Sequence, residues 1–201
     1  MTHAATDPAN VGEPTYSFRP SVLGAPRNFR LAEHAIIWDA GRRSGQIAYG
    51  RVSRVRLSFR PVSMQNHRFV TEIWSQDGPK LDIVSSSWKS IVEHLRLDDE
   101  YRAFVIELHR RLIAAGTRAR FDTGTNLLAF WGGLALLVVA ALGLAGLVVR
   151  ALEADARGAA SLIAIFLAVF LWYGSNYFRR NRPGLYRPDA LPEALLPNAK
   201  S

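Results

Sequence analysis

The residues best suited to chemistry in this chain are arginines gathered between positions 42 and 60. Arg54, Arg56 and Arg60 recur at even spacing, so a β-strand would place them on one face. A basic side chain held beside an anionic membrane surface contributes about 1 kcal/mol of attraction. This stretch therefore predicts contact with anionic lipid headgroups. The candidate lipid-surface residues are Arg42 and Arg43 on a turn and Arg54, Arg56 and Arg60 on a strand.

The same arginines have a second interpretation, in which they form a solvated sheet face. Their charges would then pair with Glu72 and Asp82 on neighbouring strands. Nucleic acid is not an expected partner, although the formal net charge is +8. The basic residues are spread over several elements, and the sequence has no helix-turn-helix, RNA-binding sheet motif or zinc-finger spacing.

No set of catalytic or metal-ligating residues can be assembled from the sequence. Cysteine is absent, and no two histidines have an H-x-x-x-H or H-E-x-x-H spacing. The run Ser85-Ser86-Ser87 lacks the G-x-S-x-G elbow of a hydrolase, and no glycine-rich phosphate loop occurs. We therefore expect no catalytic residue, metal or cofactor, and no enzymatic activity. The histidines are His3, His34, His67, His94 and His109.

Two uncharged apolar runs occupy the second half of the chain, at residues 127–149 and 159–178. As a helix, the first run would be about 34 Å long, enough to cross a hydrocarbon core of about 30 Å. The alternative is a pair of buried helices in a soluble core, but such helices seldom run this far without a charge. The sequence predicts a transmembrane helical hairpin over residues 127–178.

Arginines flank the hairpin, with Arg118 and Arg120 before it and Arg179 and Arg180 after it. The loop between the runs carries two arginines, Arg150 and Arg157, so the positive-inside rule places both termini in the cytoplasm. Neither run contains Asp, Glu, Lys, Arg or His, which disfavours a transporter or a channel. We expect a multi-pass protein of a bacterial inner membrane, with the lipid bilayer as its first partner.

The first half of the chain reads as a sheet followed by one helix. Apolar and β-branched runs alternate with turn residues from Ser17 to Ser87, and Asp77-Gly78 is a hairpin signal. A stripe of apolar residues then predicts a helix from Asp98 or Asp99 to about Ala115, with Gly116 as its stop. Residues 86–97 are ambiguous and read as a loop or a short helix. The stripe is Tyr101, Phe104, Val105, Leu108 and Leu112.

Six or seven antiparallel strands followed by one amphipathic helix resemble a pleckstrin-homology-like (PH-like) domain. The stretch Gly45-Gln-Ile-Ala-Tyr-Gly-Arg-Val-Ser-Arg-Val-Arg-Leu57 is similar to two consecutive strands of bacterial PH-like domains, and the helix over Tyr101–Leu108 fits the same pattern. The chain resembles an uncharacterised family of bacterial membrane proteins that carry such a domain ahead of two spans. The resemblance implies an α+β fold: a PH-like antiparallel β-barrel or sandwich, capped by a C-terminal helix and followed by the transmembrane hairpin. It brings no catalytic residue with it.

The expected organisation follows from these patterns. Residues 1–16 form a disordered tail, 17–116 the PH-like cytoplasmic domain, 117–126 a linker, 127–178 the hairpin, and 179–201 a proline-containing flexible tail. The expected function is a non-enzymatic protein-interaction or regulatory module held at the membrane, with a protein partner that the sequence does not identify. The alternatives are a sensor of anionic lipid surfaces and, third, an enzyme.

Overall fold

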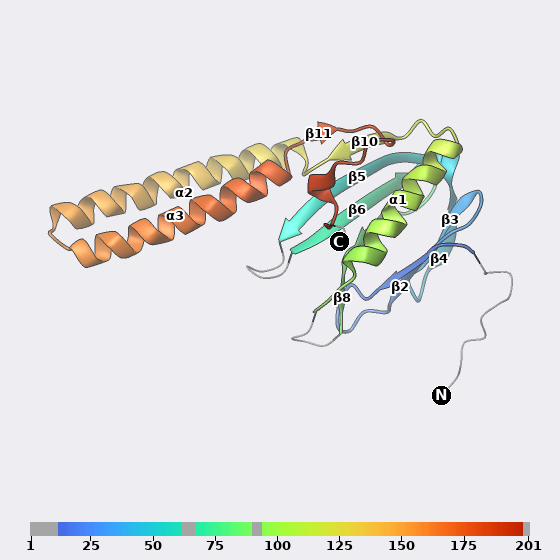
Figure 1. Ribbon diagram of the computed structural model, residues 1–201, viewed down its shortest axis with the longest axis horizontal. Helices are drawn as coiled ribbons and strands as arrows, with labels where there is room; N and C mark the ends of the chain where they lie inside the picture. Colours follow the sequence, from blue (N-terminus) through green and yellow to red (C-terminus); the bar gives the residue numbers. More distant parts are fainter. Residues whose placement is uncertain (1–11, 62–66, 90–93, 199–201) are drawn as a thin grey trace. The chain divides into compact units, whose positions relative to one another are not determined.

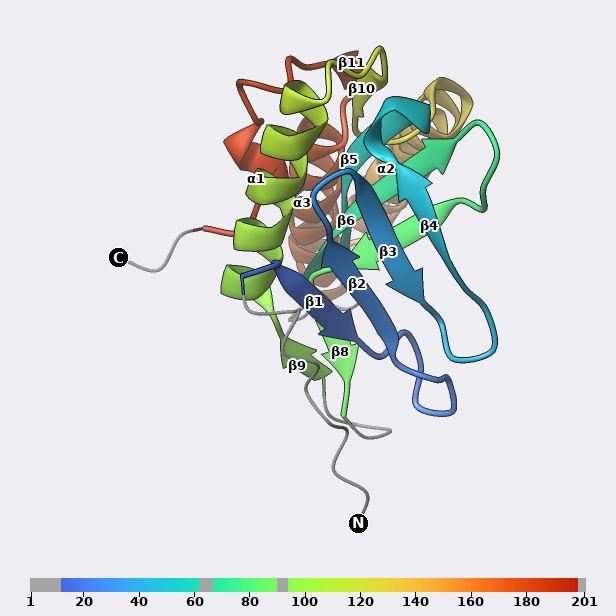
Figure 2. The ribbon, with the colours of Figure 1, turned by 90° about the vertical axis from the view of Figure 1, so that its right-hand side faces the viewer.

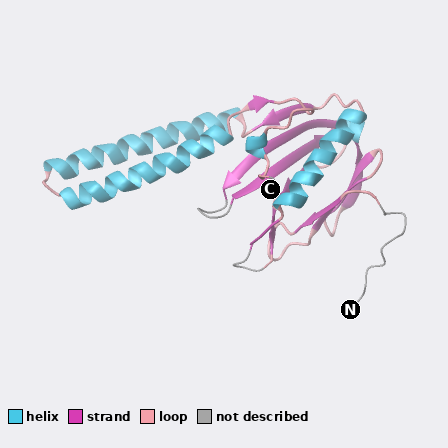
Figure 3. Cartoon of the chain, viewed as in Figure 1, coloured by secondary structure: helices cyan, strands magenta, loops and turns pink. Residues whose placement is uncertain are grey.

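The computed structural model describes residues 12–61, 67–89 and 94–198 and has an α+β architecture (Figures 1 and 3). The chain divides into two units. The first combines Met1–Asp122 with Leu185–Ser201 and is called the sheet domain below. The second, Thr123–Gly184, is called the apolar hairpin.

The first sheet of the sheet domain is an antiparallel meander of four strands. Its order is β1 (Thr15–Phe18), β2 (Arg27–Leu31), β3 (Ala35–Asp39) and β4 (Ser44–Ala48). Side chains alternate between buried and solvent-facing along these strands, as an antiparallel sheet with one wet face requires. The disordered tail was predicted to run to residue 16, but β1 already begins at Thr15. Residues 1–11 of that tail lie outside the described part.

The second sheet has the order β11-β10-β5-β6-β7. A 3-10 turn, η2 (Tyr49–Arg51), leads from β4 into β5 (Val52–Pro61), which pairs antiparallel with β6 (His67–Ser75). Strand β6 pairs antiparallel in turn with β7 (Leu81–Val84), and the predicted turn at Asp77-Gly78 lies between them. The other strands of this sheet are β10 (Arg120–Thr123) and β11 (Gly184–Leu185).

Residues 86–97 form neither of the structures that the sequence suggested. They contain a two-stranded antiparallel ladder of β8 (Ser86–Trp88) and β9 (His94–Arg96). Three residues per strand are too few for a recognisable alternation. The backbone N–H of Trp88 also donates to the Arg19 carbonyl at 3.0 Å, a contact far away in sequence.

Helix α1 (Asp98–Ala114) confirms the predicted amphipathic helix. All five residues of the apolar stripe are buried. The predicted aspartate cap is absent: Leu97 is the N-cap, and Asp98 accepts a hydrogen bond from Arg96 Nε at 2.9 Å instead. Gly116 follows the helix with a φ of 61°, a left-handed conformation that glycine adopts without strain.

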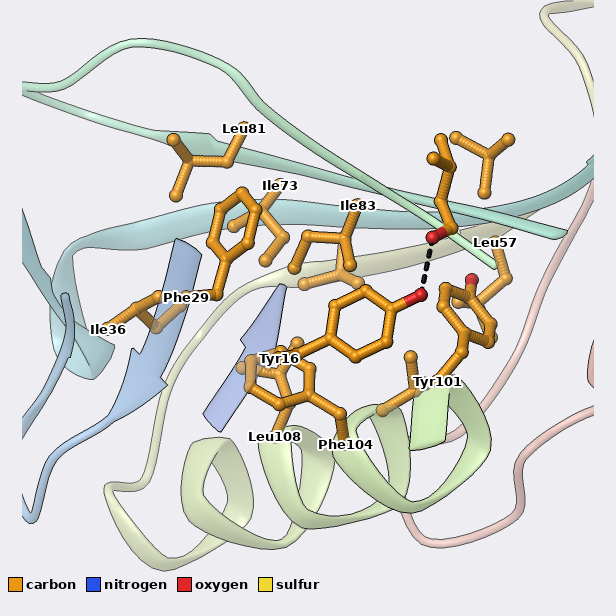
Figure 4. Close-up of a cluster of buried hydrophobic side chains, with 14 of the residues drawn as sticks. Tyr16, Phe29, Ile36, Leu57, Ile73, Leu81, Ile83, Tyr101, Phe104 and Leu108 are labelled. Carbon is orange, nitrogen blue, oxygen red and sulfur yellow. Dashed lines mark hydrogen bonds between the residues drawn. The ribbon is translucent and has the colours of Figure 1, made fainter. Parts of the chain in front are cut away.

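The core of the sheet domain lies between the two sheets and is closed along one side by α1 (Figures 1 and 2). Figure 4 shows Tyr101, Phe104 and Leu108 of α1 pointing toward Tyr16 of β1. The Tyr16 hydroxyl donates to the Val84 carbonyl at 2.6 Å, which ties the first sheet to the second.

The apolar hairpin consists of α2 (Leu127–Glu153) and α3 (Arg157–Arg180), which pack against each other. Both helices are long and apolar enough to cross a membrane, and the most apolar 18-residue stretch of α2 has none of its residues buried. Each helix extends past the uncharged run that predicted it. Asn126 caps α2, its side-chain oxygen accepting from the Ala129 N–H at 2.6 Å.

Glycines allow the two helices to approach closely. A side chain at Gly174 would meet Leu137, and one at Gly133 would meet Phe178. The sequence had singled out Gly133 with Ala129, and alanine stripes on both helices, as small contact residues. Of those alanines Ala160 is buried, whereas Gly174 was missed.

The C-terminal segment differs from the flexible tail that its prolines predicted. After β11 the chain continues along the sheet domain to a 3-10 turn, η3 (Glu193–Leu195), which contacts β5. Leu195 and Leu196 are 3% and 2% exposed and belong to the core. Burial of two leucines outweighs the extended preference of the prolines around them. The predicted linker also differs, because β10 lies within it and joins the second sheet.

Candidate functional site

The arginine face is the outer surface of strand β5 and confirms the predicted alternation. Val55, Leu57 and Phe59 are buried in the core, while Arg54, Arg56 and Arg60 point away from it. A register shift between Val52 and Arg54 marks a bulge where the strand begins. The three arginines thus share one face, as their spacing required.

Glu72 on β6 is the acid that contacts most of the cations on this face. It is opposite Arg56 in the register and only 3% exposed. Its carboxylate lies 2.5 Å from Lys80 Nζ, 3.0 Å from Arg60 Nη2 and 3.8 Å from Arg56 Nη1. Asp82, next to Glu72 on β7, lies 3.0 Å from Lys80 Nζ. The pairing of the arginine face with acids on adjacent strands is therefore present, and Lys80 joins it.

Arg54 is held by Asp122 of β10, an acid that the sequence left in the linker. Asp122 is buried and also accepts from Arg120 Nε at 2.7 Å. An aromatic side chain completes this part of the face, since the cationic groups of Arg54, Arg56 and Lys80 lie 5.0–5.2 Å from the Trp74 ring centroid. Cations at this distance from an indole ring are attracted to its π-face.

One further residue of the face, Arg68 of β6, was missed by sequence reasoning and is opposite Arg60. Ser58 lies between Arg56 and Arg60 on β5, on the face that the alternation predicts. Burial and the neighbouring Arg60 lower the pKa of the Arg68 guanidinium, and burial with the nearby Arg54 lowers that of Arg56. The even spacing of Ser58 on β5 was visible in the sequence, but its burial was not.

Arg42 and Arg43 are not part of the arginine face. Both are exposed on the turn between β3 and β4. Arg43 lines a cavity of about 180 Å³ together with Trp38 and Lys80. Arg51, beside the turn of β6 and β7, donates from Nε to Asp77 at 2.6 Å. The five candidate residues therefore form two groups.

His109 and Ser85 both have structural roles. His109 on α1 is 1% exposed, and burial lowers its pKa to about 4. Its Nδ1 lies 2.7 Å from the Val105 carbonyl and its Nε2 2.7 Å from the Tyr186 hydroxyl. Ser85 Oγ accepts from the Phe69 N–H at 3.0 Å. Within residues 12–61, 67–89 and 94–198, no group of three or more acids and histidines could hold a metal ion.

Compared with models of protein families, curated proteins and solved structures, the chain matches none of them.

Proposed function

We propose that this protein is a non-enzymatic membrane protein whose apolar hairpin anchors the sheet domain as a protein-interaction or regulatory module. The observation that carries the proposal is that the sheet domain is built from both flanks of the hairpin. The chain leaves the domain after Asp122 and re-enters it at Leu185. A domain with two attachments stays within a few residues of the membrane at both.

The contacts between the two flanks are specific. The Tyr186 N–H donates to the Phe121 carbonyl at 3.1 Å, and the two rings meet edge to face with centroids 5.6 Å apart. If both helices span the bilayer, flanks that fold together must lie on the same side of it. The arginines before α2 and after α3 favour the cytoplasmic side of a bacterial inner membrane, with both termini there.

The element order supports a PH-like identity for the sheet domain. The chain first forms a four-stranded meander and then three consecutive strands of a second sheet. The helix that closes the core follows them. Strands β4 and β7 each end a sheet, so their outer backbone groups are available for a strand of a protein partner.

A second candidate function is the sensing of anionic lipid headgroups. The observation that favours it is the pair Arg42 and Arg43, both exposed and in no ion pair with the described residues. The arginine face itself supports this function less, because Glu72, Asp82 and Asp122 neutralise much of its charge.

The topology is tested with reporter fusions after residue 201 and in the loop between α2 and α3. We expect the first fusion to report a cytoplasmic location and the second to report the opposite side of the membrane. Equal activity from both positions would contradict the anchoring hairpin.

The interaction function is tested by photo-crosslinking in native membranes. A crosslinking residue at Gln46 on β4 is expected to give a discrete protein adduct, whereas one at the exposed Leu142 of α2 controls for neighbours met within the bilayer. An unrelated two-span protein serves as a second control. The interaction proposal fails if Gln46 gives no adduct beyond those of the controls.

The lipid alternative is tested with the full chain in nanodiscs of zwitterionic or anionic lipid. Anionic lipid should slow hydrogen exchange at residues 40–45, and Arg42→Glu with Arg43→Glu should remove that effect. Identical exchange in both lipids would exclude it.

A further inference from the structure

A row of buried side chains crosses the outer face of the second sheet. Ser58 of β5, Val70 of β6 and Val84 of β7 are neighbours in the register, and they are 1%, 2% and 8% exposed. The outer face of a sheet is normally wet, so this row must be covered by side chains beside it. The Ser58 hydroxyl has no hydrogen-bond partner among the described residues, although it is buried.

The rows on either side explain the cover. On one side lie Arg56 and Glu72; on the other, Arg60 is directly opposite Arg68. The Arg60 guanidinium reaches back to Glu72 at 3.0 Å, so its aliphatic stem crosses the row of Ser58. Ser58 and Arg60 are thus neighbours on the outer face of β5, and Arg68 lies opposite Arg60 on β6.

The charge on this face is unbalanced. Its cations outnumber its carboxylates, which are Glu72, Asp82 and Asp122. Like charges directly opposite on paired strands are unfavourable, and Arg68 makes no ion pair within the described part of the chain. The Nε atoms of Arg56 and Arg68 are also buried without an acceptor among the described residues. The cations are Arg54, Arg56, Arg60, Arg68, Lys80 and Arg120.

We infer that Ser58, Arg60 and Arg68 form a binding site for one phosphate-type oxyanion. Such a group accepts several hydrogen bonds at once, which matches a hydroxyl beside two guanidinium groups. To reach the ligand, Arg60 must leave its 3.0 Å contact with Glu72, and its side chain is 47% exposed. Glu72 then keeps Lys80 at 2.5 Å and Arg56 at 3.8 Å. The bound anion relieves the repulsion between Arg60 and Arg68.

This site goes beyond the proposed anchoring and interaction functions, and it has two sources of ligand. The oxyanion is either the phosphomonoester of a lipid headgroup or a soluble phosphate. The two sources share one chemistry, so the experiment offers each of them separately.

The test follows thermal unfolding of the full chain in nanodiscs of zwitterionic phosphatidylcholine. Inorganic phosphate is titrated at constant ionic strength, with chloride as the reference. In a second arm, nanodiscs that contain phosphatidic acid replace the phosphate. We expect the unfolding midpoint to rise in at least one arm, because a ligand that binds only the folded state stabilises it.

Three variants make the test specific to the site. Ser58→Ala and Arg68→Gln should weaken binding about tenfold or more, since each removes a hydrogen bond to a charged group. Arg19→Gln removes the same charge as Arg68→Gln, but from an exposed position just after β1, and should bind as the wild type does. In chloride alone, Arg68→Gln should unfold at the same or a higher temperature, because it removes one of two facing cations.

A rise with phosphate that Ser58→Ala and Arg68→Gln diminish supports the site with a soluble ligand, and such a rise only with phosphatidic acid supports it with a lipid. The inference is overturned if neither arm raises the midpoint, or if the rise is the same in both variants as in the wild type, because phosphate also stabilises folded proteins without a site. Equal weakening by Arg19→Gln and Arg68→Gln also overturns it, because attraction would then depend on net charge alone. The reporter fusions and the crosslinks test the proposed function independently of either result.

Discussion

His109 of α1 and Tyr186 of the C-terminal segment join two parts of the sheet domain that are 77 residues apart in sequence. The His109 Nε2 atom lies 2.7 Å from the Tyr186 hydroxyl, and the ring centroids are 5.7 Å apart. Because Nδ1 donates to the Val105 carbonyl, Nε2 of the neutral ring accepts a hydrogen bond from the Tyr186 hydroxyl. This contact ties the chain after α3 to the core helix of the domain.

Tyr186→Phe should lower the free energy of unfolding by about 1–3 kcal/mol, because it leaves a buried acceptor on His109 unsatisfied. Chemical denaturation of the full chain in detergent measures the change. A cycle with His109→Gln separates the shared hydrogen bond from other losses. The assignment is wrong if the two substitutions destabilise the protein additively.

Stability should decline as the pH falls, because His109 is kept neutral in the folded state. Its pKa is about 4 there and about 6.5 when the chain is unfolded, so the unfolded state takes up the proton first. The loss starts near pH 6.5 and is complete near pH 4; between pH 7 and pH 5 it amounts to about 2 kcal/mol. Urea denaturation across this range should show the slope, and His109→Gln should flatten it. A slope that persists unchanged in that variant would assign it to other groups.

The C-terminal segment should contribute to stability through its two buried leucines. Leu195→Ala and Leu196→Ala are each expected to destabilise the sheet domain by about 2–5 kcal/mol, the cost of a cavity in a packed core. Leu185→Ala is the matched control, because that side chain is 69% exposed and its loss should cost little. If all three variants unfold at the same denaturant concentration, the segment is not part of the core.

Glu72 should be the most sensitive acid of the arginine face. Glu72→Gln leaves Arg56, Arg60 and Lys80 around a neutral side chain, and we expect a loss of about 3–5 kcal/mol. Asp82→Asn is the control, since its side chain is 42% exposed and exposed ion pairs contribute about 1 kcal/mol or less. Denaturation at low and high salt measures both, and a smaller effect at Glu72 than at Asp82 would contradict the geometry.

The packing of the apolar hairpin should depend on Gly174. A β-carbon there would lie 2.6 Å from Leu137 Cδ1, so Gly174→Val should force α2 and α3 apart and lower the unfolding temperature in detergent. Leu137→Ala should restore part of the loss by making room. Gly143→Val is the control, because a β-carbon at that position would meet no other atom within 4 Å among the described residues. Equal effects at Gly174 and Gly143 would show that the helices do not pack in this register.

The sequence predicted the elements whose pattern is local. The stripe from Tyr101 to Leu112 repeats with the period of a helix, and the alternation around Leu57 repeats with that of a strand. The two apolar runs were recognisable from length and lack of charge alone. In each case neighbouring residues carry the whole signal.

The parts that escaped prediction depend on contacts across long stretches of chain. Arg54 meets Asp122 across 68 residues, and Arg102 bonds Glu193 at 2.8 Å across 91. Leu195 and Leu196 lie among prolines with no period, so their burial had no local sign. The Ser58 row was equally hidden, because burial on the outer face of a sheet involves three strands and leaves no sign in the alternation of β5 alone.

The late position of Leu195 and Leu196 sets an order for biogenesis. During synthesis, α2 and α3 leave the ribosome before these leucines do, so the hairpin is exposed while the sheet domain still lacks part of its interior. A nascent chain halted before Leu195 would leave apolar surface on β5 and α1 open to water, where chaperones and proteases recognise it. The sheet domain therefore closes only after the segment that follows α3 has been made.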